Sequence, residues 1–275
     1  MNQETNIRKL DSRECIRVVT SNEFLKIEGL NELSLKAIKL LYIIISQCQM
    51  DDNEFYTIKI NPMELQKLWG IKKQSIYKNL KPVSKELVKL FVSVDQDDEE
   101  EFDHIPLFAR STYKTDEETK EKCYLGKLNY ESNSLFLGLK KNFSQPLLLD
   151  FNKMKTVNSI LIWHLIQIKA VSKSKKPVGH KKIKSIVTVD EIRKITGTIN
   201  KYKKMLDFRR RVIDQAIKEI YKNCNVKIEY TPIKEGKNII AFEFRMINKY
   251  AIPKKQLSAK GERMLRRAKE FKLVN

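Results

Sequence analysis

Apolar positions in the first half of the chain switch between helical spacing and strand alternation. They predict a helix, a strand, two helices and a strand, in that order, over residues 34–49, 55–60, 61–70, 73–90 and 91–94. The third of these elements begins with a capping box, in which Asn61 is the N-cap, Pro62 takes the first helical position and Glu64 is the reciprocal acceptor. Gly70 is expected to end this helix. A hairpin of strands 123–130 and 134–139 is expected to follow.

The second half of the chain repeats this order. The expected elements are a helix, a short strand, a capped helix, a long helix and two strands, over residues 158–170, 186–187, 188–197, 201–223, 226–231 and 239–246. At an offset of 127 residues, Thr188 falls on Asn61, Glu191 on Glu64 and Gly197 on Gly70. Helix, strand, helix, helix and hairpin is the order of a winged helix. The sequence therefore predicts an α+β protein with two tandem winged-helix domains.

The domain boundaries follow from these elements and from charge. We expect a lead-in over residues 1–30 with a short strand near 16–20, a first winged-helix domain over 31–145, a second over 150–250, and a basic tail over 251–275. Residues 95–121 contain 11 acidic and 3 basic side chains and are interpreted as a solvated insertion in the first domain. A basic linker is expected over residues 172–184. Pro82 is expected to kink its helix or to begin a second segment, 83–90.

Net charge separates the two halves. The chain carries 54 Lys and Arg and 34 Asp and Glu, a net charge of +20. Residues 1–150 hold 22 of the basic and 24 of the acidic residues, so residues 151–275 hold 32 and 10, a net charge of +22. An excess confined to one half indicates a polyanionic partner. Double-stranded DNA is the favoured partner, and ribosomal RNA remains an alternative at this point.

Catalytic and membrane functions are disfavoured. No phosphate-binding glycine loop is present, and the histidines are isolated, without the spacing of a metal site. The four cysteines lie far apart and form no C-x-x-C pair. No apolar stretch approaches the roughly 20 residues that span a bilayer, and the first ten residues lack a signal-peptide core. We expect a cytoplasmic, non-enzymatic protein without cofactor, metal or membrane contact, in which His164 is a packing residue.

The helix expected over residues 201–223 is the candidate DNA-reading element. At about 100° per residue its apolar positions gather on one side, namely Met205, Phe208, Val212, Ile213, Ala216 and Ile220. Basic residues dominate the opposite face, where arginine is suited to guanine and lysine to phosphate. The candidate DNA-contacting residues here are Lys201, Lys203, Lys204, Asp207, Arg209, Arg210 and Arg211. Arg209 falls at the edge of the core stripe, so a phosphate contact or packing of its stem is expected.

Two further sets of residues are candidate DNA contacts. Lys234 and Lys237 lie in the turn of the last hairpin, which would be the wing. In the first domain, the helix equivalent to 201–223 offers Lys72, Lys73, Ser75, Lys78 and Lys81. Because it carries fewer charges beside an acidic segment, this helix is expected to make a weaker DNA contact or mainly a protein interface.

Residues 202–220, with the strands 226–230 and 240–244 and the turn Lys234-Glu235-Gly236-Lys237, resemble the C-terminal signature of iteron-binding plasmid replication initiator (Rep) proteins. Residues 31–45 and 76–94 resemble the family's first winged helix. The resemblance implies two winged helices related by pseudo-twofold symmetry, with residues 201–211 as the main groove-reading segment. It also implies binding to directly repeated origin sites, opening of adjacent A·T-rich DNA and assembly of a host replication initiator and helicase. Dimerisation through the first domain, with autorepression at an inverted repeat and copy control, is implied as well.

Two other functions stay open on sequence alone. A transcriptional regulator of a mobile element could use the same fold on an operator. An origin-nicking enzyme is disfavoured, because its tyrosine would need a metal-binding histidine cluster that the chain lacks.

Overall fold

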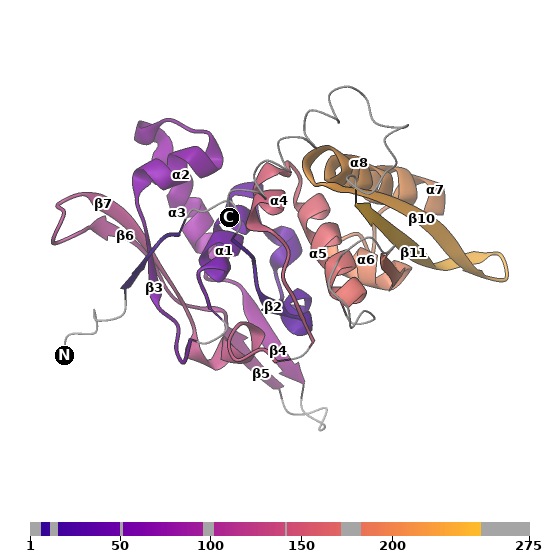
Figure 1. Ribbon diagram of the computed structural model, residues 1–275, viewed down its shortest axis with the longest axis horizontal. Coiled ribbons are helices and arrows are strands. Elements are labelled where there is room, and N and C mark those ends of the chain that lie inside the picture. The colour runs from indigo at the N-terminus through magenta and orange to yellow at the C-terminus, as the bar shows by residue number, and fades with distance from the viewer. Residues whose placement is uncertain are drawn as a thin grey trace, which may run out of the picture.

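The computed structural model describes residues 7–11, 16–49, 52–95, 102–140, 142–171 and 183–248, which form two lobes joined by α4 (Leu148–Lys153) and α5 (Val157–Val171) (Figure 1). The acidic run 97–101, the expected basic linker as far as residue 182 and the expected basic tail lie outside the described residues.

The N-terminal lobe is a winged helix with additions at both ends. Its helices are α1 (Leu35–Ser46), α2 (Pro62–Trp69) and α3 (Ile76–Leu87), with short 3₁₀ turns at Asn22–Lys26, Leu30–Glu32, Lys73–Ser75 and Tyr130–Leu135. Its strands are β1 (Ile7–Lys9), β2 (Thr20–Ser21), β3 (Thr57–Ile60), β4 (Phe91–Asp95), β5 (Phe102–Pro106), β6 (Phe108–Thr115), β7 (Lys122–Leu128) and β8 (Phe143–Ser144).

The C-terminal lobe has the same plan without the additions. It contains β9 (Ile183–Thr188), α6 (Val189–Ile195), α7 (Met205–Phe208), a π-helical turn (Arg209–Ile213), α8 (Asp214–Asn223), β10 (Val226–Glu235) and β11 (Asn238–Asn248). Its sheet has the order β10-β11-β9, and the first lobe has the corresponding order β6-β7-β3, with β1 added beside β3. Both sheets join the wing hairpin to the strand that precedes the capped helix. The tandem winged-helix prediction is therefore confirmed at the level of topology.

Both predicted capping boxes are present. The Asn61 side chain accepts from the Glu64 amide at 3.0 Å, and the Glu64 carboxylate accepts from the Asn61 amide at 2.8 Å. The Thr188 hydroxyl accepts from the Glu191 amide at 3.1 Å, and the Glu191 carboxylate accepts from the Thr188 amide at 2.8 Å. Each box satisfies two amide groups that a helix start leaves free, so both helices begin where the sequence places them.

The first wing is not where the pattern predicted it. Residues 95–121 were interpreted as an insertion, yet they contain β5 and all of β6, and β6 pairs with β7 to form the hairpin. The acidic residues from Asp116 to Glu121 occupy the turn between β6 and β7, so their charge conceals the strand before them. Residues 134–139 form no strand, because a 3₁₀ turn begins at Tyr130 and Gly138 adopts a left-handed φ of 62°. A further hairpin, β4–β5, precedes the wing.

The proline in α3 does not divide the helix. α3 runs from Ile76 to Leu87 with the exposed Pro82 inside it, and it ends before residue 90. The segment 83–90 that was predicted as an alternative is therefore not a separate helix.

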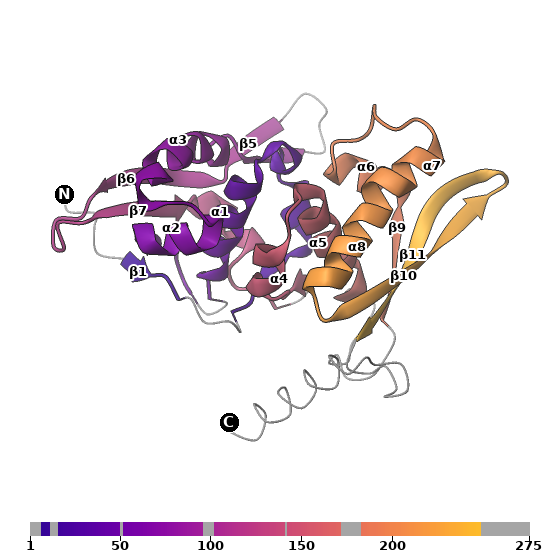
Figure 2. The same cartoon turned by 90° about the horizontal axis from the view of Figure 1, so that it is seen from above.

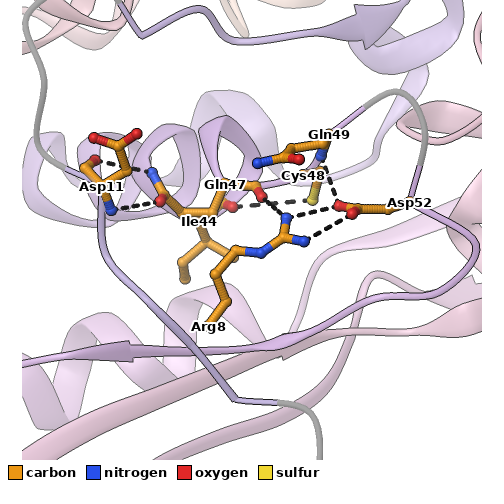
Figure 3. Close-up of polar contacts among 7 residues, drawn as sticks. All are labelled: Arg8, Asp11, Ile44, Gln47, Cys48, Gln49 and Asp52. Atoms are coloured by element: carbon orange, nitrogen blue, oxygen red, sulfur yellow. Dashed lines mark hydrogen bonds and ion pairs between the residues drawn. The ribbon is translucent and has the colours of Figure 1, made fainter.

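The N-terminal strand is fastened to the end of α1 (Figure 3). The Arg8 guanidinium donates to both carboxylate oxygens of Asp52 at 2.7 Å and to the carbonyl of Gln47. The Gln47 side chain in turn accepts from the Asp11 amide at 2.7 Å. Although burial opposes ionisation, the hydrogen bonds from Arg8 and from the Gln49 amide hold the pKa of Asp52 below its usual value. These contacts hold β1 in place as the fourth strand of the sheet.

Helix α5 belongs to the cores of both lobes. It packs against β9 and α8 of the second lobe and against β8 of the first, and Figures 1 and 2 both place it between the lobes. One continuous cluster of buried apolar side chains runs from Val18 through α5 to Met246. The expected second domain begins at residue 150 and would contain the whole of α5, whereas the helix packs against both lobes.

His164 on α5 is buried within the first lobe. Its Nδ1 shares a hydrogen bond with the Tyr42 hydroxyl at 2.7 Å, and its Nε2 lies 3.0 Å from both the Thr20 and the Ser144 hydroxyls. The side chain is fully buried, and burial lowers its pKa from 6.5 to about 3. His164 is thus a packing residue, as expected. Its neutral imidazole also connects α5 to α1, β2 and β8 through these hydrogen bonds.

Because His164 is buried in its neutral form, we expect the stability of the fold to fall with pH already above the range in which carboxylates titrate. Below pH 6.5 the unfolded chain binds a proton at His164 that the folded chain binds only near pH 3, so stability falls as pH falls through this window. Between pH 7.5 and 5 we expect the free energy of unfolding to drop by about 2 kcal/mol. Urea unfolding across this range measures it. His164→Gln should remove most of this pH slope, and an unchanged slope in that variant would contradict the assignment.

Candidate nucleic-acid interface

The second lobe contains a helix-turn-helix made by α6, a turn over residues 196–204 and the helix that starts at Met205. The turn needs two left-handed residues, Gly197 with φ 61° and Tyr202 with φ 51°. Glycine adopts this conformation without strain, whereas tyrosine does so only where its surroundings hold it there.

Arg193 on α6 holds this turn. Its guanidinium donates to the carbonyls of Thr198, Lys201 and Tyr202 at 2.7–3.0 Å, and it stacks 4.2 Å from the centre of the Phe208 ring. One side chain thus satisfies three turn carbonyls and packs on the first turn of the next helix. The start of the second helix is thereby fixed relative to α6 before any ligand binds.

The second helix carries a wide turn at its arginines. In the π-helical turn Arg209–Ile213 the Asp214 amide donates to the Arg209 carbonyl, five residues back. The extra residue lets both Val212 and Ile213 point into the core, where each is at most 1% exposed. Such turns are rare and frequently lie at functional sites. Here the turn begins with three consecutive arginines, Arg209 to Arg211.

Arg210 and Arg211 project from this turn into solvent. Both are exposed, and no carboxylate among the described residues forms an ion pair with either. Arg211 also lies 5.8 Å from the Tyr202 ring centre. A shallow open hollow of about 420 Å³ lies beside them, lined also by Asp214, Gln215 and Lys218. Two unpaired guanidinium groups on the exposed face of the second helix can grip phosphate or the edge of guanine.

Arg209 is used differently from its two neighbours. It is half-buried, its Nε donates to the Tyr230 hydroxyl at 3.3 Å, and that hydroxyl donates to Asp214 at 2.6 Å. Burial, reinforced by the hydrogen bond to Asp214, raises the pKa of Tyr230. This chain of contacts ties the π-helical turn to β10, so the structure places Arg209 at the edge of the core.

The predicted lysines lie outside the helix. Lys201, Lys203 and Lys204 belong to the turn before it, and the helix starts at Met205 rather than at residue 201. All three are exposed, and Asp207 on α7 is half-buried. The basic patch therefore continues from the helix onto the turn that Arg193 holds.

The second wing is the hairpin β10–β11, whose tip extends away from the body in both views (Figures 1 and 2). Gly236, with φ 58°, makes the turn, and Lys234 and Lys237 flank it with both side chains exposed. Unpaired lysines at the tip of a wing are suited to phosphate.

The first lobe presents an opposite charge at the same position. The turn between β6 and β7 carries Asp116, Glu117, Glu118 and Glu121. Asp116 pairs with Lys59 at 2.6 Å and accepts from the Thr119 amide and hydroxyl at 2.9 Å, and these contacts lower the pKa of its carboxyl well below the usual range. Lys59 offsets the charge of Asp116 and Lys120 lies in the same turn, so the tip keeps a smaller negative charge, which disfavours contact with the DNA backbone.

The lysines predicted in the first lobe are accessible. Lys72 and Lys73, at the 3₁₀ turn before α3, and Lys78 and Lys81, on α3, are exposed, whereas Ser75 is half-buried. Tyr77 on the same helix is 57% exposed, with its ring 6.1 Å from that of Tyr113 on β6. In both views α3 and α7 lie on the same side of the long axis of the molecule.

Two residues of the interface were missed by sequence reasoning. Arg193 acts on backbone carbonyls, which leave no mark in the sequence. Glu219 on α8 accepts from the Thr156 and Ser159 hydroxyls at 2.8 and 2.6 Å and from the Lys155 amide, at the start of α5. A carboxylate at a helix N-terminus is stabilising, and this one fastens the candidate DNA-reading helix to the helix shared by both lobes.

Neither a metal site nor a membrane span is found within the part of the chain that the structure describes. No group of three or more His, Cys, Asp or Glu side chains there could hold a metal ion. The helices of this part are each too short or too polar to cross a bilayer.

Comparison with solved structures finds the Pi initiator protein, whose crystal structure is of a complex with iteron DNA. It is 22% identical, the match covers 86% of this chain and 98% of that one, and the TM-score is 0.67. Identity at this level shows a shared fold. A structure of domains 2 and 3 of RctB also matches, at 10% identity and a TM-score of 0.35 over 80% of this chain and 81% of that one.

The sequence matches two family models in tandem. Residues 17–167 match the first winged-helix domain of the initiator replication proteins, and residues 188–246 match the second winged-helix domain of the initiator Rep proteins. The first match includes α5 as far as residue 167, in agreement with the packing of His164 against the first lobe. The chain belongs to the initiator Rep protein family.

Proposed function

We propose that the chain initiates plasmid replication by binding directly repeated origin sites, with its second lobe as the principal DNA contact. The observation that carries this is that Arg210 and Arg211, on the second helix of a helix-turn-helix, expose guanidinium groups without an ion-pair partner among the described residues. In such motifs that helix enters the major groove. The Pi initiator, which shares the fold, was crystallised with iteron DNA.

The two lobes are proposed to contribute unequally. In the second lobe the helix, the preceding turn and the wing all present Lys or Arg. In the first lobe α3 and the 3₁₀ turn before it offer four exposed lysines beside an acidic wing. We expect α3 to approach a neighbouring groove of the same duplex while its wing stays away from the backbone. Family membership supports the further proposals that the bound protein opens A·T-rich DNA and assembles a host initiator and helicase. It likewise supports a homodimer through the first lobe that represses its own promoter.

Footprinting on the DNA around the gene tests the proposed function. We expect protection of several directly repeated sites, each about two helical turns long. When more of these sites are occupied, the cleavage pattern of the A·T-rich DNA beside them should change. Protection of a lone inverted repeat would instead favour a transcriptional regulator. We also propose that the protein has no nuclease activity. Incubation with supercoiled origin plasmid and Mg²⁺ or Mn²⁺ should leave it intact, and a nicked, protein-linked product would overturn this.

The wing gives a prediction of its own. Lys234→Ala with Lys237→Ala should weaken binding to all DNA sequences alike, because phosphates carry no base identity. The slope of log K against log salt concentration should become shallower by about 2, one for each phosphate group that the variant no longer neutralises. Fluorescence anisotropy at several salt concentrations measures it. Lys227→Ala is the matched control, since Lys227 lies at the base of the same hairpin and pairs with Glu229 at 2.8 Å. An unchanged slope in the double variant would exclude the wing from the interface.

A further inference from the structure

One large apolar side chain stands on the basic face of the DNA-reading helix. Leu206, in the first turn of α7, is 74% exposed, the highest value among the large apolar residues of the described chain. Exposed Lys203, Lys204 and Arg210 surround it in sequence. Leu206 and Arg210 are four residues apart, so they lie about one helical turn apart on the same side.

Leu206 has no part in the core that the described residues form. The apolar stripe of this helix is made by Met205, Phe208 and Val212, which turn toward the lobe. A leucine left in solvent forgoes the free energy of burying its apolar surface. The side chain is nevertheless held in a fixed place, because Arg193 fixes the turn before it and stacks on Phe208 two residues later.

The chemistry of the major groove supplies an apolar partner. Among the base edges there, only thymine presents a methyl group, and the other groups are hydrogen-bond donors and acceptors. The first turn of the second helix in a helix-turn-helix is the part that reaches the base edges. An apolar side chain at this place can contact a thymine methyl group, while the neighbouring Lys and Arg side chains contact phosphates of the DNA backbone.

We infer that Leu206 contacts the C5-methyl group of a thymine in the major groove and thereby specifies an A·T pair next to the base pair contacted by Arg210. This inference rests on the proposed function, since it requires the second lobe to dock on DNA through α7. It adds to the arginine contacts a residue that discriminates by shape and hydration instead of charge.

Replacing the thymines of the protected site by uracil, one at a time, tests the contact, because uracil lacks only the methyl group. For the native protein we expect an approximately fourfold loss of affinity at one thymine, the effect of about one methyl group left in water. Leu206→Ala should show a similar loss on the thymine site and no further loss at that uracil. Ile240→Ala, which removes an apolar side chain that is 44% exposed on β11, should keep the native response.

The possible outcomes separate the two proposals. If the native protein bound the protected site no better than random DNA, the proposed function and this inference would both be wrong. If it bound specifically but Leu206→Ala kept the full loss on removing that methyl group, or uracil had no effect at any position, only the inference would be overturned. Because Leu206 is exposed, the thermal unfolding midpoint of Leu206→Ala should match that of the native protein, which excludes misfolding as the cause of an effect.

Discussion

Replacing Arg210 and Arg211 together with alanine is expected to lower the affinity for the specific DNA site by about 2–6 kcal/mol, at least about thirtyfold. Each guanidinium is exposed, projects from the same π-helical turn and has no ion-pair partner among the described residues. Neither therefore has to break an ion pair with a described residue before it binds a guanine edge. Titration of labelled site DNA by anisotropy, at one fixed salt concentration, measures the loss.

Conservative and distant variants separate base reading from simple charge. Arg210→Lys with Arg211→Lys retains the charge but loses the paired donors that fit guanine, so it should keep binding to random DNA and lose discrimination. Arg245→Ala removes a half-buried arginine on β11 whose Nε already donates to Glu243 at 2.8 Å, and it should bind almost as the native protein does. Full specific affinity in the double alanine variant would refute the assignment of this helix.

The parts of the fold that sequence predicted are those decided by neighbours in the chain. The capping boxes at Asn61 and Thr188 need only a partner three residues away, and the left-handed glycines at 70 and 197 need only the helix they end. Because these signals are local, both helix-turn-helix units and their repeat could be read from one sequence. The exposed side of the 205–223 helix followed from periodicity in the same way.

The errors concern elements that distant residues decide. β6 was missed because a strand is defined by its partner β7, while the acidic turn at Asp116 made the whole segment look like a solvated loop. The long helix starts four residues late because Arg193, on another helix, holds residues 198–202 in a turn. The π-helical turn is stabilised by burying both Val212 and Ile213, a tertiary effect that a fixed 100° per residue does not describe.

The same distinction applies to the candidate site. Arg210, Arg211 and the wing lysines were identified because exposed basic residues can be read from charge and periodicity. At 100° per residue Leu206 falls about 20° from Ile213, at the edge of the core stripe, so periodicity did not indicate its exposure. Glu219 and Arg193 could not be identified, because their partners are hydroxyl and backbone groups on other elements. The sequence thus indicates the candidate DNA-contacting side chains more completely than it indicates the residues that hold them in place.

Phe208→Ala should lower the free energy of unfolding by about 3–5 kcal/mol, the usual range for removing a fully buried phenylalanine. Its ring is 0% exposed, lies in the core of the second lobe and carries the Arg193 guanidinium 4.2 Å above it. The loss would be a large part of the stability of an ordinary domain. Because the two lobes share one core through α5, we expect a single cooperative transition at a lower urea concentration rather than loss of the second lobe alone.

Leu206→Ala is the matched control for this variant, since it truncates an apolar side chain two residues away that is 74% exposed. It should unfold within about 0.5 kcal/mol of the native protein, as surface substitutions do. Phe208→Leu keeps most of the buried volume and should lose much less than alanine. We therefore expect the two sites to differ in role, with Phe208 required for folding and Leu206 dispensable for it. Equal stability losses at both positions would mean that α7 is not oriented as described, and with it the exposure of Arg210 would be in error.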